Sequence, residues 1–181
     1  MADMPIYLRQ LVAAAVISGA AGVGMLAQHP EMPPGMTHEE HLAQMQKDAK
    51  LKKRGGDAMG FDQDRTAHHF RLYKAGGAIE VVTRDSADDV SRAQIRTHLK
   101  TIAEQFATGD FGTPLATHGE VPPGVRTMQD RRSALTFKYE ELPGGGRVRI
   151  TASDAIATDA VHEFLRYQIR EHATGDPLAV K

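Results

Sequence analysis

The series Phe70-Arg71-Leu72-Tyr73, Gly76-Gly77, Ile79-Glu80-Val81 and Ala107-Thr108-Gly109-Asp110 recurs once in this chain of 181 residues. The second occurrence reads Phe137-Lys138-Tyr139-Glu140, Gly144-Gly145-Gly146, Val148-Arg149-Ile150 and Ala173-Thr174-Gly175-Asp176. A recurring block of this kind is typical of a supersecondary unit that buries its apolar face against its copy. The repeat predicts a fold, but it specifies no reaction.

Each copy begins with a predicted β-hairpin. Apolar and polar residues alternate along 70–73 and 79–83, as they do in a half-buried hairpin, and 74–77 supplies the turn. The second hairpin alternates in the same way along 135–150, with its turn at 143–146. One face of the resulting sheet is apolar, and the other is charged.

A helix is predicted after each hairpin. The first begins near Ser86 and ends at Gly109, and the second begins at Asp154 or Thr158 and ends at Gly175. Their apolar stripes are Ile95, Leu99, Ile102 and Phe106 in the first helix, and Val161, Phe164, Leu165 and Gln168 in the second. We therefore predict an α+β fold for residues 57–177: a two-layer ββα-ββα internal duplication, with a four-stranded antiparallel sheet and two helices on one face.

Composition excludes several classes of function. The formal net charge is -1, so the chain has no overall basic surface for nucleic acid. No cysteine is present, which excludes disulfides, thiolate catalysis and cysteine-ligated metal sites. The sequence also lacks the common hydrolase, phosphate-loop, dinucleotide and zinc-protease motifs. An acid–base pair of His118 with Glu120 or Asp130 stays open, although a non-enzymatic protein is the better interpretation.

The N-terminus predicts export. Residues 11–27 carry no charge, but seventeen residues rich in alanine and glycine are barely enough to span a bilayer. We expect residues 1–27 to be either a cleaved signal peptide or an uncleaved inner-membrane anchor. Either one places the rest of the chain in the periplasm, or outside the cell if it is secreted, and limits membrane contact to this segment.

Residues 28–56 form a segment rich in histidine, methionine and proline. The prolines at 30, 33 and 34 predict an extended linker. Thr37 and Glu40 then form a possible capping box, which opens a short helix that continues to about Lys53 and ends at Gly55-Gly56. We treat this segment as flexible, and residues 178–181 as a tail.

Histidine and methionine supply the clearest chemical signal. In a protein without cysteine, imidazole and thioether ligands suit copper best. His38, His41 and Met45 share one face of the predicted helix. His118 and Met128 lie in the segment 111–132 between the copies, which we expect to be irregular. These five residues are the candidate copper ligands; the alternative is that the helix is part of a polar tether and 111–132 a simple connector.

The other histidines are interpreted as structural. His68 and His69 are adjacent on a strand and point to opposite faces, so they cannot chelate one ion together. His98 lies beside an apolar stripe and aligns with Phe164 of the second copy. His172 aligns with Phe106 of the first, and both alignments favour packing.

A resemblance covers about residues 59–176. The residues that carry it are Met59 to Leu72 (MGFDQDRTAHHFRL), Gly76 to Val81, Gly109-Asp110-Phe111, Pro122 to Val125 and His162 to Arg166. They resemble a family of small uncharacterised bacterial exported proteins, some of which carry the label aspartate carbamoyltransferase. That enzyme has two larger α/β domains and a Ser-Thr-Arg-Thr phosphate motif, and this chain has neither. The resemblance implies export and a shared domain, and no catalytic residue.

A second hypothesis makes the domain a protein-interaction or assembly module without catalytic activity. It would use the open charged face of the sheet against a protein partner or in a homodimer. The residues of this face are Arg71, Glu80, Lys138, Arg147 and Arg149.

Overall fold

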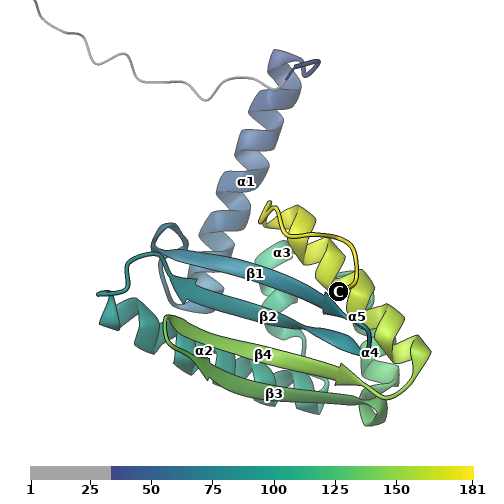
Figure 1. The fold of residues 1–181 in the computed structure, drawn as a ribbon. Helices are drawn as coiled ribbons and strands as arrows, with labels where there is room; N and C mark the ends of the chain where they lie inside the picture. Colours follow the sequence, from purple (N-terminus) through teal and green to yellow (C-terminus); the bar gives the residue numbers. More distant parts are fainter. Residues whose placement is uncertain (1–33) are drawn as a thin grey trace, which may run out of the picture. The chain divides into compact units, whose positions relative to one another are not determined.

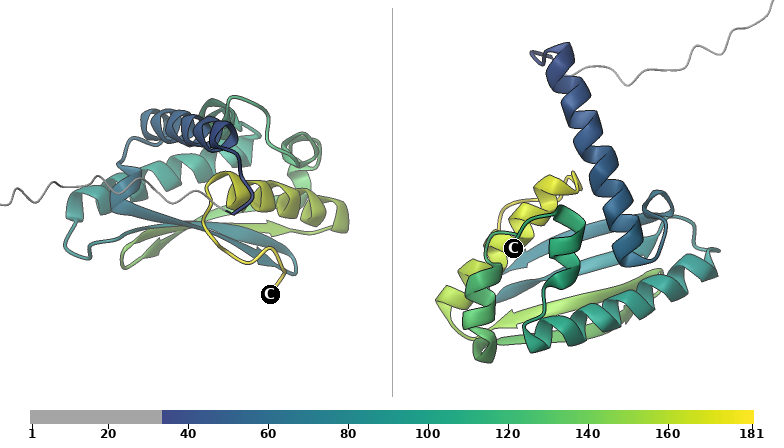
Figure 2. Two further views of the ribbon diagram at one scale, coloured as in Figure 1. Left: turned by 90° about the horizontal axis from the view of Figure 1, so that it is seen from above. Right: turned by 180° about the vertical axis from the view of Figure 1, so that it is seen from behind.

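Four antiparallel strands form one sheet in the order β1-β2-β4-β3, and all five α-helices of the described region lie on one side of it (Figures 1 and 2). This computed structural model describes residues 34–181, of which 37–181 form one compact unit. The strands are β1 (Thr66–Tyr73), β2 (Gly76–Thr83), β3 (Leu135–Leu142) and β4 (Gly145–Ala152). The predicted α+β fold with a four-stranded antiparallel sheet is confirmed.

The two hairpins have matching bounds and matching register. The bounds of β3 and β4 are those of β1 and β2 shifted by 69 residues, from 66 to 135 and from 76 to 145. Thr66 pairs with Thr83 in the first hairpin, and Leu135 pairs with Ala152 in the second, at the same shift. That the copies arose by duplication stays a prediction.

The repeated glycines bring the two hairpins together. Gly76 and Gly145 begin β2 and β4, the two central strands. The sequence analysis had placed both glycines in the turns. A Cβ atom at Gly76 would overlap the carbonyl oxygen of Ile150, and one at Gly145 would overlap that of Val81. Glycine at these positions therefore permits the close approach of β2 and β4.

Helix α2 (Asp89–Thr108) follows the first hairpin, and α5 (Ala155–Glu171) follows the second. The caps are Asp88, which accepts from the Ser91 N–H at 3.0 Å, and Asp154, which accepts from the Ala157 N–H at 2.7 Å. The prediction of Ser86 as a cap is wrong, while Gly109 ends α2 as predicted. Helix α5 stops at Glu171 and not at Gly175, because the chain turns there to run back along β1.

Helix α1 (His38–Met59) begins at the predicted capping box of Thr37 and Glu40. It continues through Gly55 and Gly56 and ends at Gly60, so the predicted end was wrong. Two glycines inside a helix cost only about 1 kcal/mol each, and buried Leu51 shows that this half of α1 packs on the domain. The N-terminal half of α1 points away from the sheet (Figure 1).

The segment between the copies is more regular than expected. It contains α3 (Gly112–His118), α4 (Val125–Asp130) and the single-turn helix η2 (Arg132–Ala134), while a similar turn, η1 (Gln63–Arg65), precedes β1. Its Phe111, Val125 and Met128 are buried in the common core. The sequence was misleading here because Gly112 and Pro114 lie in the first turn of α3, where proline is tolerated, and the other glycines and prolines lie between α3 and α4.

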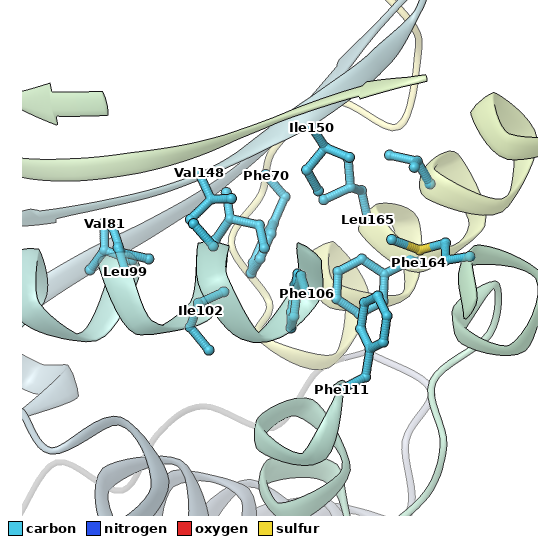
Figure 3. Close-up of a cluster of buried hydrophobic side chains, with 14 of the residues drawn as sticks. Phe70, Val81, Leu99, Ile102, Phe106, Phe111, Val148, Ile150, Phe164 and Leu165 are labelled. Atoms are coloured by element: carbon cyan, nitrogen blue, oxygen red, sulfur yellow. The ribbon is translucent and has the colours of Figure 1, made fainter. Parts of the chain in front are cut away.

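One hydrophobic core lies between the sheet and the helices. Phe106, Phe111 and Phe164 converge in it, below Val148 and Ile150 of β4 (Figure 3). The ring centroids of Phe106 and Phe111 are 4.3 Å apart, and those of Phe106 and Phe137 are 5.7 Å apart with the rings edge to face. We call Phe106, Phe137 and Phe164 the phenylalanine cluster.

The C-terminal segment covers the outer edge of β1. The Asp176 carboxylate accepts from the Phe70 N–H at 3.0 Å and from the Arg71 guanidinium at 2.7 Å. Farther on, the Lys181 N–H donates to the Leu72 carbonyl at 3.1 Å. The segment therefore satisfies backbone groups that an edge strand would leave unpaired.

The predicted signal peptide or anchor, residues 1–27, and the start of the proline-rich linker lie outside the described residues. Between residues 34 and 181, no helix combines the length and the apolar character that a membrane span requires.

Candidate functional site: a pocket lined by four histidines

Four histidines from four parts of the fold line one pocket. His68 comes from β1, His98 from α2, His118 from the last turn of α3, and His172 from the residue that caps α5. Met59 at the end of α1 and Gln168 of α5 complete the polar and sulfur-containing lining. We call these six residues the histidine pocket; the remaining wall is mostly apolar and includes Phe106 and Phe164 of the phenylalanine cluster.

The pocket is small. Its cavity measures about 60 Å³. A single water needs about 10–15 Å³ of such space, whereas pockets for drug-sized ligands measure about 300–1,000 Å³. A metal ion with one small ligand therefore fits, and a large organic cofactor does not. His68 and His172 also line a second, polar hollow of about 270 Å³ with Arg84 and Thr174, which we call the outer hollow.

The histidine rings form a contiguous series. The ring centroids of His68 and His172 are 5.6 Å apart with nearly parallel planes, and those of His172 and His118 are 5.2 Å apart. Phe61 contacts both His68, at 5.8 Å, and His98, at 5.5 Å. The four imidazoles thus gather around one apolar space and are not scattered over the surface.

These histidines are uncharged at neutral pH. Burial, together with the neighbouring His98, His69 and Arg84, lowers the pKa of His68 to about 4. Burial alone lowers the pKa of His98 to about 4, and burial with the charges of His68 and His118 lowers that of His172 to about 3. The pKa of His118 also falls through burial. Neutral imidazole is the form that binds metal ions.

Three buried polar atoms at this pocket have no hydrogen-bond partner among the described residues: His68 Nε2, His118 Nδ1 and Gln168 Nε2. His118 Nε2 lies 2.9 Å from Gln168 Oε1. The amide oxygen can only accept, so Nε2 carries the proton and the lone pair of His118 is at Nδ1. An unpaired polar atom is costly to bury, and three in one pocket indicate an occupant that pairs with them.

Residues outside the pocket lining fix the position of His118. The Arg54 guanidinium of α1 donates to the backbone oxygens of Thr117, at 2.9 Å, and His118, at 3.1 Å. On the other side, the ring of Tyr167 contacts His118 edge to face at 5.0 Å and donates its hydroxyl to Glu120 at 2.8 Å. Burial and this hydrogen bond raise the pKa of Tyr167. The end of α3 is therefore held from both sides.

The structure separates the five predicted copper ligands. His118 lies in the histidine pocket, but Met128 is only 1% exposed in the hydrophobic core and does not line the pocket. Met45, His41 and His38 precede Arg54 by nine, thirteen and sixteen residues, so they lie about 14–24 Å along α1 from the contact with His118. Met45 is 44% exposed. The five residues do not form one site.

The described residues contain no group of three or more histidine, cysteine, aspartate or glutamate side chains already arranged to hold a metal ion. The rings of the histidine pocket are near one another, but their nitrogens do not yet converge on one point.

Sequence reasoning missed three of the four pocket histidines. His98 and His172 were assigned to packing because the repeat places Phe164 and Phe106 at the matching positions. His68 was interpreted as structural because it cannot bind one ion together with its neighbour His69. The alignment of the repeat could have identified His98 and His172. Phenylalanine at the matching positions shows that packing alone does not require imidazole there. The strand register shifts the first hairpin onto the second by 69 residues, so Phe137 is the counterpart of His68 and not of Phe70, with which the sequence repeat aligned it.

Two other histidines have structural partners. His162 is buried, and its Nε2 lies 2.9 Å from the Tyr73 carbonyl oxygen and 3.1 Å from that of Gly76, which ties α5 to the first hairpin. His69 faces the opposite side of β1 from His68, and its Nδ1 lies 3.2 Å from the Asp176 carboxylate.

The open face of the sheet carries a chain of ion pairs across all four strands. Arg71 and Glu80 approach to 3.4 Å, Arg147 lies 3.5 Å from both Glu80 and Glu140, and Arg149 lies 3.1 Å from Glu140. The 3.5 Å approaches of Arg147 lack hydrogen-bond geometry, so Coulomb attraction is their main contribution. These charges neutralise one another within the sheet, and no observation singles this face out for a partner.

Comparisons of this chain with protein-family models, with curated proteins and with solved structures found no match.

Proposed function

We propose that this chain is an exported metal-binding protein that holds a copper ion in the histidine pocket. The observation that carries the proposal is the gathering of four neutral imidazoles around one small cavity, with unpaired nitrogens on two of them. A metal ion is the occupant that accepts lone pairs from several neutral imidazoles at once.

The spacing of the rings supports this proposal. Two imidazoles bound to one ion at a metal–nitrogen distance of about 2.0–2.1 Å have ring centres roughly 5 Å apart. The observed centroid distances of 5.2 and 5.6 Å fall close to that value. To bind one ion, the rings would have to turn about their side-chain bonds so that their nitrogens converge.

Copper is favoured by the ligand set. Met59 adds a thioether to the imidazoles, and the lining has no carboxylate, which magnesium, calcium and manganese would prefer. A histidine that binds a metal through one ring nitrogen usually donates the N–H of the other to a polar group, which fixes its tautomer. The hydrogen bond from His118 Nε2–H to Gln168 Oε1 would serve this purpose. Zinc would also bind imidazole, so the metals have to be compared directly.

The test is titration of the full chain with Cu(I), Cu(II) and Zn(II). We expect one copper per chain with a Kd well below micromolar, and at least a 100-fold loss in His68→Phe and in His172→Phe. Phenylalanine is chosen because the other copy has it at the matching position in each case, Phe137 for His68 and Phe106 for His172. The matched control is His69→Gln, next to His68 but on the opposite face and still able to donate to Asp176. Copper binding no tighter than micromolar, or equal losses in the control, would overturn the proposal.

The proposal of export rests on the uncharged residues 11–27, and a separate experiment tests it. We expect the protein to be in the periplasmic fraction of the cell that makes it, and mass spectrometry of the intact chain distinguishes a cleaved signal from a retained anchor. Recovery of the uncleaved protein from the cytosol would contradict export without bearing on the metal site.

A further inference from the structure

We infer that the open edge of β3 is a dimerisation surface. Strand β3 pairs antiparallel with β3 of a second copy of this chain, with Tyr139 at the centre of the pair, and joins two four-stranded sheets into one of eight strands. This inference goes beyond the proposed function, because it involves neither the histidine pocket nor a metal ion.

The two edges of the sheet differ in what covers them. The segment after α5 covers β1 through Asp176 and Lys181, whereas β3 is the strand at the opposite edge (Figure 1). The repeat matches Asp176 with Asp110, which follows α2, the helix packed on β3 and β4. Asp110 instead accepts from the Gly112 N–H at 2.8 Å, where the chain turns into α3. The segment that could have covered β3 is therefore used elsewhere.

The backbone of β3 is open to a further strand. In an antiparallel pair, alternate residues bond to the neighbouring strand and the others point away from it. On β1 the outward residues are Phe70 and Leu72, which bond to the C-terminal segment. The shift of 69 residues makes Tyr139 and Glu141 their counterparts, with Phe137 in the same alternation. No described segment outside the sheet bonds to these three backbones, so this edge is a template for strand pairing.

Apolar side chains at this edge are incompletely covered. Leu135, Phe137 and Tyr139 pack against the core but are only partly buried. On the covered strand β1, Phe70 is 3% exposed and Leu72 is 2% exposed. A strand paired with β3 would bury more of the three side chains and place Tyr139 opposite its own copy, where aromatic side chains stabilise strand pairing.

Charge identifies the partner as a second copy. Lys138 is exposed, has no ion pair among the described residues, and lies opposite Arg149 of β4. Pairing centred on Tyr139 places Lys138 opposite Glu140 of the second copy, and the reverse, so two pairs of opposite charge form. A centre at residue 138 would place two lysines opposite each other, and a centre at 140 two glutamates. The Glu140 side chain is 30% exposed and can accept this further cation.

The first test is sedimentation equilibrium of the full, metal-free chain over micromolar concentrations. We expect a monomer–dimer equilibrium in the wild type. Lys138→Glu should weaken the dimer by at least about tenfold, because it replaces two attractions by two repulsions. The matched control is Lys74→Glu, the same change of charge at an exposed position in the turn of the first hairpin, and it should dimerise as the wild type does. All variants retain residues 1–33, so any contribution of these residues to association is constant.

A charge exchange tests the register directly. Glu140→Lys should also weaken the dimer, because each strand then carries two positive charges at the pair. An equimolar mixture of Lys138→Glu and Glu140→Lys should form a heterodimer, since one strand is then doubly negative and the other doubly positive. This recovery requires both variants to be folded, so it also controls for loss of structure.

Amide hydrogen exchange tests the location. The N–H groups of Phe137 and Tyr139 should exchange more slowly as the protein concentration rises. The Phe70 N–H is the internal control, because it already bonds to Asp176 and its exchange should not depend on concentration.

The outcomes are distinct. A monomer at every concentration overturns the inference and leaves the proposed metal site standing. Equal dimer affinity, within twofold, in the wild type and Lys138→Glu overturns the register. A dimer without protection of the Phe137 and Tyr139 amides overturns the edge of β3 as the interface. Absence of copper binding overturns the proposed function alone, because the dimer is measured without metal.

Discussion

The phenylalanine cluster and the histidine pocket occupy matching positions in the two copies and differ in chemistry. Phe137 corresponds to His68, Phe164 to His98 and Phe106 to His172. The centroid distance between Phe106 and Phe137 is 5.7 Å, and that between their counterparts His172 and His68 is 5.6 Å. The same scaffold therefore presents three aromatic rings twice, as imidazole in one cluster and as benzene in the other.

The matched positions show that the fold requires an aromatic ring there but does not require imidazole. Benzene rings fill the core without any polar atom to satisfy, so packing alone favours phenylalanine. The imidazoles are held neutral against their usual pKa, and two have nitrogens without partners. Their presence costs stability, which is typical of residues kept for function.

The largest expected effect is on stability, when the two rings of one matched pair, Phe106 and His172, are each removed. Phe106→Ala should lower the free energy of unfolding by about 3–5 kcal/mol, because it leaves a cavity in the core. His172→Ala should cost less than half as much, because it also removes a polar ring that is desolvated by burial. Urea denaturation of the metal-free protein measures both. Equal costs would make His172 a packing residue and remove the contrast between the clusters.

Low pH should destabilise the folded protein through the histidines of the pocket. The folded pKa values of His68, His98 and His172 are about 4, 4 and 3, below the usual 6.5 of the unfolded chain. Below pH 6.5 the unfolded state therefore binds protons that the folded state does not, and stability falls as the pH drops toward about 4.

The variant that carries phenylalanine at all three positions, His68→Phe with His98→Phe and His172→Phe, isolates this effect. Its free energy of unfolding should change less between pH 6.5 and pH 4.5 than that of the wild type, since carboxylates contribute equally to both proteins. Identical pH dependence in the two proteins would show that these histidines are not the acid-sensitive groups.

A smaller effect is expected when the partly buried Met59 and the buried Met128 are each replaced. Met59 lines the histidine pocket, and Met128 lies in the core. Met59→Leu should weaken Cu(I) binding about tenfold, whereas Met128→Leu should leave it unchanged and cost less than about 1.5 kcal/mol of stability. Competition with a Cu(I) chelator measures the affinities. A loss only in Met128→Leu would return the site to the ligand set first expected from the sequence.

The smallest effect is expected on α1. His38→Ala and His41→Ala should leave the copper affinity of the pocket unchanged, because both residues lie far along the helix from His118. Calorimetric titration of the double variant checks this. A lower stoichiometry with the pocket intact would reveal a second, separate site on α1.

The sequence predicted the sheet and its helices because alternation, helical spacing and Asp or Gly caps are local signals. It placed His118 among the candidates because His118 lies outside the repeat. It could not show that His68, His98 and His172 meet, since they approach only when the first hairpin, α2 and the end of α5 pack together. Met128 was wrongly grouped with His118, because a methionine in a predicted loop does not reveal that the loop folds into a buried helix.

The covering of β1 by the C-terminal segment has a consequence for folding order. His172 lies just before this segment, while His68 lies on the strand that the segment covers. The site therefore joins an early part of the chain to a late one and cannot be complete until α5 has docked. Under the proposed function, a metal ion would therefore meet the complete set of histidines only in a chain whose C-terminal helix has already docked on the sheet.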